Sequence, residues 1–108
     1  MSDSTSTMRP RRFSSDVLVS TRGAHELLER AGLSIFDLTD RHHSGDWGDI
    51  DAEDAAANEL ALIEGTRLLS AYKFQAPGED GCGTFEAVVW LITEADRSAT
   101  TVLLPEEY

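Results

Sequence analysis

The sequence predicts an α+β domain: a short N-terminal strand, then three helices, then a three-stranded antiparallel meander with the helices packed on one face. Apolar residues recur at helical spacing between residues 22 and 64. After Gly65 the pattern changes to runs of β-branched and aromatic residues, separated by Gly, Pro and polar turns. Strands that follow one another through short turns pair antiparallel, so this order predicts a meander covered by the preceding helices.

The N-terminal part is predicted to hold a tail, a strand and a helix. Residues 1–12 are rich in Ser and Thr and lack apolar periodicity, so we expect a disordered tail before a single domain over residues 13–108. The β-branched stretch Asp16–Thr21 predicts a short strand, and Thr21 is placed to cap a helix over residues 22–31. That helix ends at Gly32, and its core stripe is Ala24, Leu27, Leu28 and Ala31.

Two further helices are predicted, over residues 35–43 and 52–64. Ser34 caps the first, whose inward face carries Ile35, Leu38 and His42, whereas His43 points elsewhere. The second starts at Asp51, with acids in the first turn, where the helix dipole favours them. It ends at Gly65, and its inner stripe is expected at Ala52, Ala56, Leu60 and Ile63.

The meander is predicted to contain strands over residues 67–74, 85–93 and 99–105. The second strand is apolar on both faces, so we expect it at the centre of the sheet. Cys82 is the single cysteine and lies between two glycines, which indicates an exposed turn and excludes a disulfide within the chain. We expect a cytoplasmic protein without membrane contact, because the sequence shows neither a signal-peptide pattern nor an apolar run of membrane-spanning length.

Charge is distributed unevenly along the chain and limits the classes of partner. The net charge is −11, of which residues 1–30 contribute +1 and residues 31–108 contribute −12. An acidic body repels nucleic-acid phosphates, which argues against a protein that coats DNA or RNA through a broad basic face. Two functional interpretations remain, a localised cationic pocket within an acidic shell or a surface that binds basic partners. The third alternative is that the charge serves solubility alone.

The polar stretch from Arg41 to Asp54 is the focus of the sequence. It contains two adjacent histidines, several carboxylates, and a Trp between Gly45 and Gly48, and these glycines favour a tight, shaped loop. Trp47 is either an aromatic anchor within a polar rim or a core residue that closes the bottom of the sheet, and both alternatives stay open. The aspartates here lack the spacing and terminal Glu of an EF-hand, so we expect no metal, and nothing indicates a cofactor.

Several motifs resemble those of a family of small bacterial proteins that are often encoded on plasmids and other mobile elements. The motifs are RHxSGDWGD (Arg41 to Asp49), RLLSAY (Arg67 to Tyr72) and WxITEADRSATTVLLPEEY (Trp90 to Tyr108), with Asn58 between the first two. Members of this family are usually labelled plasmid-related or type I restriction endonuclease subunit M. The resemblance implies an accessory role beside nucleic-acid-handling or restriction-type proteins. The chain is too short for a methyltransferase domain and lacks the Gly-rich loop and the Asn-Pro-Pro-aromatic motif of such an enzyme.

Two functions of different classes fit these residues. In the first, the protein binds a basic protein surface, and the binding residues are Trp47, Asp46, Asp49, Arg67 and Tyr72. In the second, a barnase-like or toxin-like ribonuclease uses His42 as general acid or base, and RNA is its partner. Its phosphate-binding and oxyanion-binding residues are then Arg97, Thr100 and Ser70.

Arg97 also has a structural alternative, which is to pair with Glu94 or Asp96 across its own turn. Between the two functions the sequence favours binding, because binding of a basic partner uses the acidic charge. It leaves the oligomeric state open.

Overall fold

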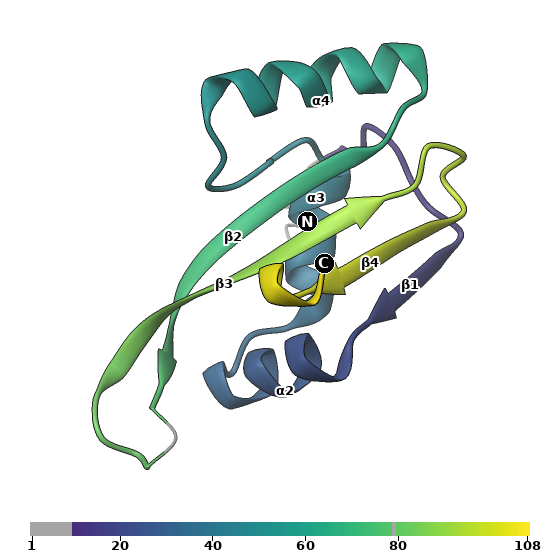
Figure 1. The fold of residues 1–108 in the computed structure, drawn as a ribbon. Coiled ribbons are helices and arrows are strands. Elements are labelled where there is room, and N and C mark those ends of the chain that lie inside the picture. The colour runs from purple at the N-terminus through teal and green to yellow at the C-terminus, as the bar shows by residue number, and fades with distance from the viewer. Residues whose placement is uncertain (1–9, 79) are drawn as a thin grey trace, which may run out of the picture.

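The computed structural model describes residues 10–78 and 80–108 and shows an α+β fold (Figure 1). Its helices are α2 (Arg22–Ala31), α3 (Ile35–His43) and α4 (Ala52–Glu64), and a short 3-10 helix, η1 (Pro105–Glu107), follows the last strand. Its strands are β1 (Val17–Ser20), β2 (Leu68–Pro77), β3 (Thr84–Thr93) and β4 (Ala99–Leu103). The bounds predicted for all three helices are confirmed, and each predicted strand is found within a few residues.

The helices begin at the capping residues that the sequence predicts. The side chains of Thr21, Ser34 and Asp51 each accept a hydrogen bond from a backbone N–H in the first turn of α2, α3 and α4. Gly32 and Gly65 end α2 and α4 with φ of 72° and 76°, a left-handed conformation that glycine adopts without steric cost. Local signals therefore suffice to place the helices.

The four strands form one mixed sheet in the order β1-β4-β3-β2. β2 to β4 make the predicted antiparallel meander, and β3 lies inside it as expected. The prediction of a three-stranded sheet with a separate short strand is corrected, because β1 pairs with β4 in parallel, from Val17 opposite Ala99 to Ser20 opposite Val102. A parallel neighbour needs a long connection, and here every element from α2 to β3 lies in that connection.

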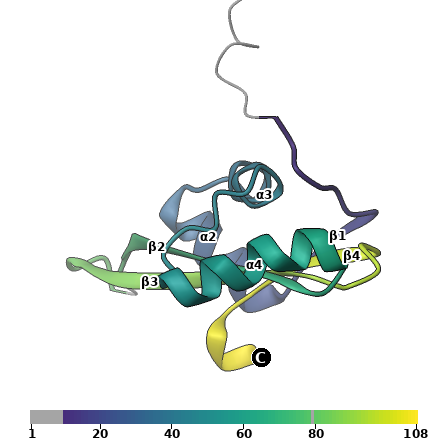
Figure 2. The same ribbon diagram turned by 90° about the horizontal axis from the view of Figure 1, so that it is seen from above.

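Two of the helices cover one face of the sheet, which we call the inner face. Figure 2 shows α3 on this face and the C-terminal segment with η1 on the opposite one, and α2 contributes Ala24 and Leu28 to the same core as Leu38 of α3. The main core lies between these two helices and the inner face of the sheet. It contains Ala24, Leu28, Leu38, Tyr72, Val89, Leu91 and Val102. α4 instead lies alongside the edge strand β2, so the prediction that all three helices pack on one face is wrong for α4 (Figures 1 and 2).

The side of α4 that contacts the domain also differs from the prediction. Asn58 and Ala61 are buried, whereas Leu60 and Ile63 are 52% and 82% exposed. The predicted inner stripe, Ala52, Ala56, Leu60 and Ile63, therefore faces solvent. Periodicity could not decide between the two sides, because apolar residues occur around most of this helix.

The segment before β1 contacts the domain across α3 and α4. The Arg12 backbone N–H donates to the His43 carbonyl at 2.7 Å, and its guanidinium forms two hydrogen bonds with the Glu59 carboxylate at 2.8 and 2.7 Å. Arg12 thus contacts the domain although the sequence assigns it to the tail; residues 1–9 of that tail lie outside the described residues. Within residues 10–78 and 80–108, no helix is long and apolar enough to cross a membrane.

Candidate functional site

The polar side chains that the sequence singles out for catalysis meet on the inner face of the sheet. His42 projects from the last turn of α3 toward β2, β3 and β4, which contribute Ser70, Thr93 and Thr100. Thr93 and Thr100 lie opposite each other in the register of β3 and β4, so their side chains share this face. The fold therefore brings together three of the four proposed catalytic residues, His42, Ser70 and Thr100.

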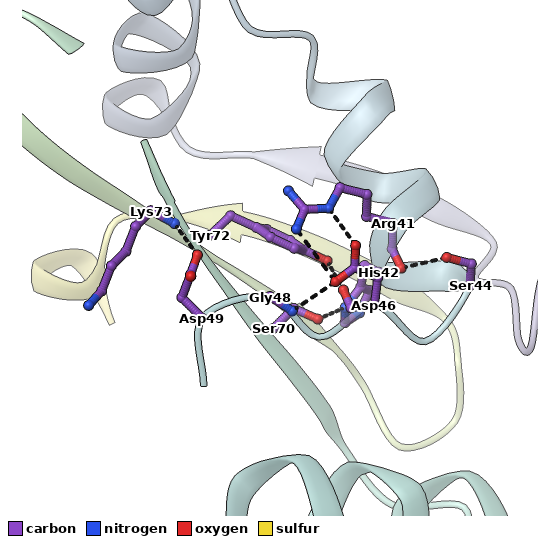
Figure 3. A network of polar contacts seen from close by, with 9 residues as sticks. All are labelled: Arg41, His42, Ser44, Asp46, Gly48, Asp49, Ser70, Tyr72 and Lys73. Carbon is purple, nitrogen blue, oxygen red and sulfur yellow. Dashed lines mark hydrogen bonds and ion pairs between the residues drawn. The ribbon is translucent and has the colours of Figure 1, made fainter. Parts of the chain in front are cut away.

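Both ring nitrogens of His42 are engaged by hydroxyl groups. Nδ1 lies 2.5 Å from Ser70 Oγ, and Nε2 lies 2.8 Å from Thr93 Oγ1, which lies 2.7 Å from Thr100 Oγ1 (the Ser70 contact is drawn in Figure 3). All four side chains are 0% exposed. Since a neutral imidazole has one donor and one acceptor, this arrangement satisfies it completely. No solvent reaches the group that a ribonuclease would use as its acid or base.

The hydrogen-bonded chain continues toward the N-terminal segment. Thr100 Oγ1 lies 2.7 Å from Ser15 Oγ, which lies 3.4 Å from His43 Nε2. Among the described residues, the buried His43 Nδ1 has no hydrogen-bond partner. The sequence places His43 off the inward face of α3, but the N-terminal segment covers it, and it is only 5% exposed. The result is one buried network with Ser70 at one end and His43 at the other.

Electrostatics keep the histidines of this network neutral. Burial lowers the pKa of His42 to about 3, with further contributions from the neighbouring His43 and Arg97. Burial also lowers the pKa of His43, and the positive charge of Arg11 acts in the same direction. Burial thus favours neutral imidazoles in this network, in which the ring nitrogens of both histidines, except His43 Nδ1, have hydroxyl partners.

Phe13 closes the network from the N-terminal side. Its ring contacts the rings of His42 and His43 edge-on, at centroid distances of 5.1 and 5.0 Å, and stacks on Trp47 at 6.1 Å. The Arg97 guanidinium lies over the same ring, 5.7 Å from its centroid. His42 and Arg97 therefore both contact Phe13, and apolar carbon occupies the place where a shared phosphate would need polar space.

Among residues 10–78 and 80–108, Arg97 forms no ion pair with a carboxylate, and its guanidinium binds backbone carbonyls. Its Nη1 donates to the carbonyls of Thr66 and Glu94 at 2.7 and 3.1 Å, and its Nη2 donates to the Ala61 carbonyl at 3.2 Å. These acceptors lie at the C-terminal end of α4, in the link from α4 to β2 and in the turn before β4, and carbonyls at a helix C-terminus carry partial negative charge. Arg97 thus joins α4 to the β3–β4 turn, through backbone carbonyls rather than the side chains of Glu94 or Asp96, and its predicted phosphate-binding role stays a prediction.

Trp47 is a core residue, so the structure decides between the two alternatives for this side chain. It is 6% exposed, packs in a second core with Ala61 and Leu68, and donates a hydrogen bond from Nε1 to the Glu59 carboxylate at 3.0 Å. An exposed aromatic anchor is therefore excluded. The apolar ring is buried while the indole N–H reaches a partner at the surface, as buried tryptophans usually do.

The loop around Trp47 covers the outer edge of β2. Its backbone exchanges two hydrogen bonds with Ala71, from the Asp49 N–H at 2.6 Å and to the Trp47 carbonyl at 3.2 Å. The Asp49 carboxylate accepts from the Lys73 backbone N–H at 2.8 Å (Figure 3). Two positions earlier in the strand, the Asn58 amide accepts from the Leu69 N–H at 3.1 Å and donates to the Leu69 carbonyl at 2.7 Å. Both outward backbone groups of Leu69 and Ala71 and the N–H of Lys73 are thus paired, which protects this part of the edge strand.

Asp46 and its neighbours hold this loop in shape. Arg41 Nε donates to the Asp46 carboxylate at 2.7 Å, and the Arg41 guanidinium lies over the Tyr72 ring, 4.4 Å from its centroid. The Tyr72 hydroxyl donates to the Asp46 carbonyl at 2.6 Å, and the Gly48 N–H donates to the Asp46 side chain (Figure 3). Asp46 and Tyr72, predicted to contact a partner, instead fix the conformation of the loop.

Arg67, the remaining predicted binding residue, lies on the surface at the start of β2. It donates a hydrogen bond to the Tyr108 hydroxyl at 2.8 Å, and its guanidinium lies 3.7 Å from the Glu94 carboxylate. It therefore links the C-terminus to the sheet. Of the residues predicted to bind a partner, Arg67 and Asp49 alone are exposed.

Sequence reasoning did not assign roles to Phe13, Ser15 and Thr93. Phe13 stands next to a polar tail, and a single aromatic there carries no periodic signal. Thr93 ends an apolar strand directly opposite Thr100, and that pair of hydroxyls could have been found from the strand register. Comparisons of the chain find no matching family model, curated protein or solved structure.

Proposed function

We propose that this chain is an accessory protein that binds a cationic protein surface through the solvent face of α4. The observation that carries the proposal is the exposed apolar stripe of Ala52, Ala56, Leu60 and Ile63, which contains two of the largest exposed aliphatic side chains of the described residues. Contiguous apolar side chains held outward by a stable helix are typical of interaction surfaces.

The charges around the stripe support a basic partner. Glu53 and Glu64 flank it on one side, and α4 contains no basic residue. Glu59, on the other side, already forms an ion pair with Arg12. A second copy would bring the same negative helix against this one, so self-association through α4 is opposed by like charges. A partner with apolar side chains between lysines or arginines complements both the stripe and its rim.

The class of partner follows from the same charge. Proteins that handle nucleic acid carry basic surfaces, because their ligand is a polyanion. An acidic helix can occupy such a surface. The resemblance to plasmid-related and restriction-associated proteins agrees with this class and stays a prediction.

The ribonuclease alternative has less support. It needs His42 at the surface and Arg97 free to hold a phosphate, whereas His42 is 0% exposed and the Arg97 guanidinium donates to backbone carbonyls. The buried hydroxyl groups instead saturate the imidazole and hold α3 on the sheet.

The test is to measure, by isothermal titration calorimetry, the binding of a synthetic amphipathic helical peptide made of Leu and Lys residues. We expect micromolar affinity that weakens as salt rises, because part of the attraction is between exposed charges. The double variant Leu60→Ser, Ile63→Ser should lose about tenfold or more in affinity.

The matched control is Phe36→Ser, which removes a 68% exposed apolar side chain from α3. It should bind like the wild type. Equal loss in the control and the double variant, or binding without salt dependence, would overturn the proposal.

A further inference from the structure

β3 extends well beyond its partner on one side. The β3–β4 ladder begins at Trp90 opposite Leu103, whereas β3 itself starts at Thr84 and pairs with β2 along its whole length. β4 ends at Leu103, and the chain then turns into η1. The part of β3 before Trp90 therefore has an edge without a neighbouring strand, as the long hairpin of β2 and β3 in Figure 1 shows.

The register identifies which backbone groups this edge presents. The Glu94 N–H donates to the Ala99 carbonyl at 3.0 Å, so even-numbered positions of β3 bond toward β4 in an antiparallel ladder. Continuing toward the N-terminus, the N–H and C=O groups of Val88 and Glu86 point to the same side. No hydrogen bond among residues 10–78 and 80–108 engages these groups.

A groove of about 420 Å³ runs along this edge, between β3, α2 and η1. Its apolar lining includes Leu27, Val88 and Leu104, and its rim carries the exposed carboxylates of Glu26, Glu86 and Glu106. None of the ion pairs among the described residues involves these three glutamates. The single base in the lining is Arg30, whose guanidinium donates to the Pro77 carbonyl.

The wall that η1 forms is fixed in place. The Glu107 carboxylate accepts hydrogen bonds from the Thr21 hydroxyl at 2.5 Å and from the Leu104 N–H at 2.9 Å. Gly23 permits this contact, because a Cβ there would lie 2.5 Å from a Glu107 oxygen. The groove is thus bounded by β3, α2 and η1, and hydrogen bonds of Glu107 hold η1 beside the start of α2.

We propose that this groove binds an extended basic segment of another protein by adding it as a strand to β3, in line with β4. The free N–H and C=O groups of Val88 and Glu86 supply the main-chain bonds of such strand addition. The apolar lining takes the methylene stems of Lys or Arg side chains, and the three glutamates bind their charged ends. The site is separate from the α4 face, with which it shares no residue.

A second copy of the chain is a poor occupant of the same groove. Pairing two β3 edges would bring Glu86 of one copy beside Glu86 of the other, together with the other rim carboxylates, and like charges directly opposite are destabilising. The volume suits a segment of a few residues rather than a folded surface. Charge and space therefore select an extended cationic peptide.

The experiment is an NMR titration and amide exchange measurement with a nine-residue peptide of alternating Lys and Val. We expect shifts confined to the groove residues and new protection of the Val88 and Glu86 amides, because these become hydrogen-bonded. The double variant Glu26→Lys, Glu106→Lys should weaken binding about tenfold. Val88→Pro removes one of the exposed donors without touching the β2 ladder and should also weaken it.

Three controls separate the possible causes. Glu29→Lys reverses a glutamate of α2 outside the groove lining and should bind the peptide like the wild type. The α4 variant Leu60→Ser, Ile63→Ser should also bind it normally, so failure of the α4 proposal leaves this one standing. A peptide with Glu in place of Lys should not bind. Shifts on α4 instead of β3, or unchanged exchange at Val88 and Glu86 under saturating peptide, would overturn the inference.

Discussion

Gly48 allows the loop around Trp47 to approach the backbone of β2 closely. Gly48 has φ of 78°, and a Cβ there would lie 2.2 Å from the Ala71 carbonyl oxygen. The sequence predicts a shaped loop at this glycine, but the reason for the shape is the close approach of the loop to β2. That approach depends on a long-range contact and could not be read from the loop alone.

Gly48→Ala should therefore destabilise the fold more than a positive φ alone would. Gly81 is the matched control, since its φ is 79° and no described atom outside its own neighbours would lie within 4 Å of a Cβ there. We expect a loss of about 1 kcal/mol for Gly81→Ala and at least about 3 kcal/mol for Gly48→Ala in urea unfolding. Similar losses in both variants would contradict the steric role of the Ala71 contact.

The lowered pKa of His42 predicts that the stability of the fold depends on pH. Its pKa is about 3 in the folded protein against 6.5 as the ordinary value, so between these values the unfolded chain binds the proton and the folded one does not. Stability is therefore lost as pH falls below 6.5, by about 2 kcal/mol between pH 7 and pH 5 from this residue. Urea unfolding of wild type and His42→Gln at several pH values measures it, and the variant should show the shallower slope. Equal slopes would mean that His42 is not held neutral by burial.

At the scale of elements, α4 serves β2 as a substitute for a neighbouring strand. Asn58 pairs with both backbone groups of Leu69 while the loop before α4 pairs with Ala71 and Lys73. The edge is thereby closed without a fifth strand. This use of a helix explains why a polar residue occupies its buried side and why its apolar stripe is free.

Asn58→Ala tests whether the hydrogen bonds of Asn58 to Leu69 stabilise the edge of β2. It leaves the N–H and C=O of Leu69 unpaired in a site where Asn58 is only 4% exposed, so we expect a loss of about 2 to 3 kcal/mol. Amide exchange at Leu69 should accelerate more than at the inner strands. Ala57→Ser, on the exposed side of the same helix, should change stability by less than about 0.5 kcal/mol. Unchanged exchange at Leu69 in Asn58→Ala would refute the edge role.

The sequence predicts the elements better than it predicts their faces. Helix bounds follow from Thr21, Ser34 and Asp51 at the starts and from Gly32 and Gly65 at two of the ends, all of which are local signals. Three features instead depend on contacts between distant segments. They are the parallel pairing of β1 with β4, the solvent exposure of the apolar stripe that contains Leu60, and the burial of Trp47. The predicted cluster of His42, Ser70 and Thr100 exists because helical and strand periods place these side chains on one face, but exposure is not encoded by periodicity.

At the scale of the whole molecule, the N-terminal segment seals the second core. Phe13 contacts His42, His43, Trp47 and Arg97, while Arg12 joins α3 and α4. Removing residues 1–13 should therefore lower the melting temperature by about 5 to 10 °C relative to a chain that lacks residues 1–9 only. Differential scanning calorimetry of the two truncations measures this. Equal melting temperatures would show that the segment contributes nothing to the core.

We propose that this protein acts by binding at its acidic α4 face, and that its histidine network has a structural role. The most direct measurement is the NMR footprint of the amphipathic Leu and Lys helix on the wild-type protein at low salt. We expect shifts on the solvent side of residues 52–64 and unperturbed signals for His42, Ser70, Thr93 and Thr100. Shifts centred on those four residues, with no response from α4, would contradict it.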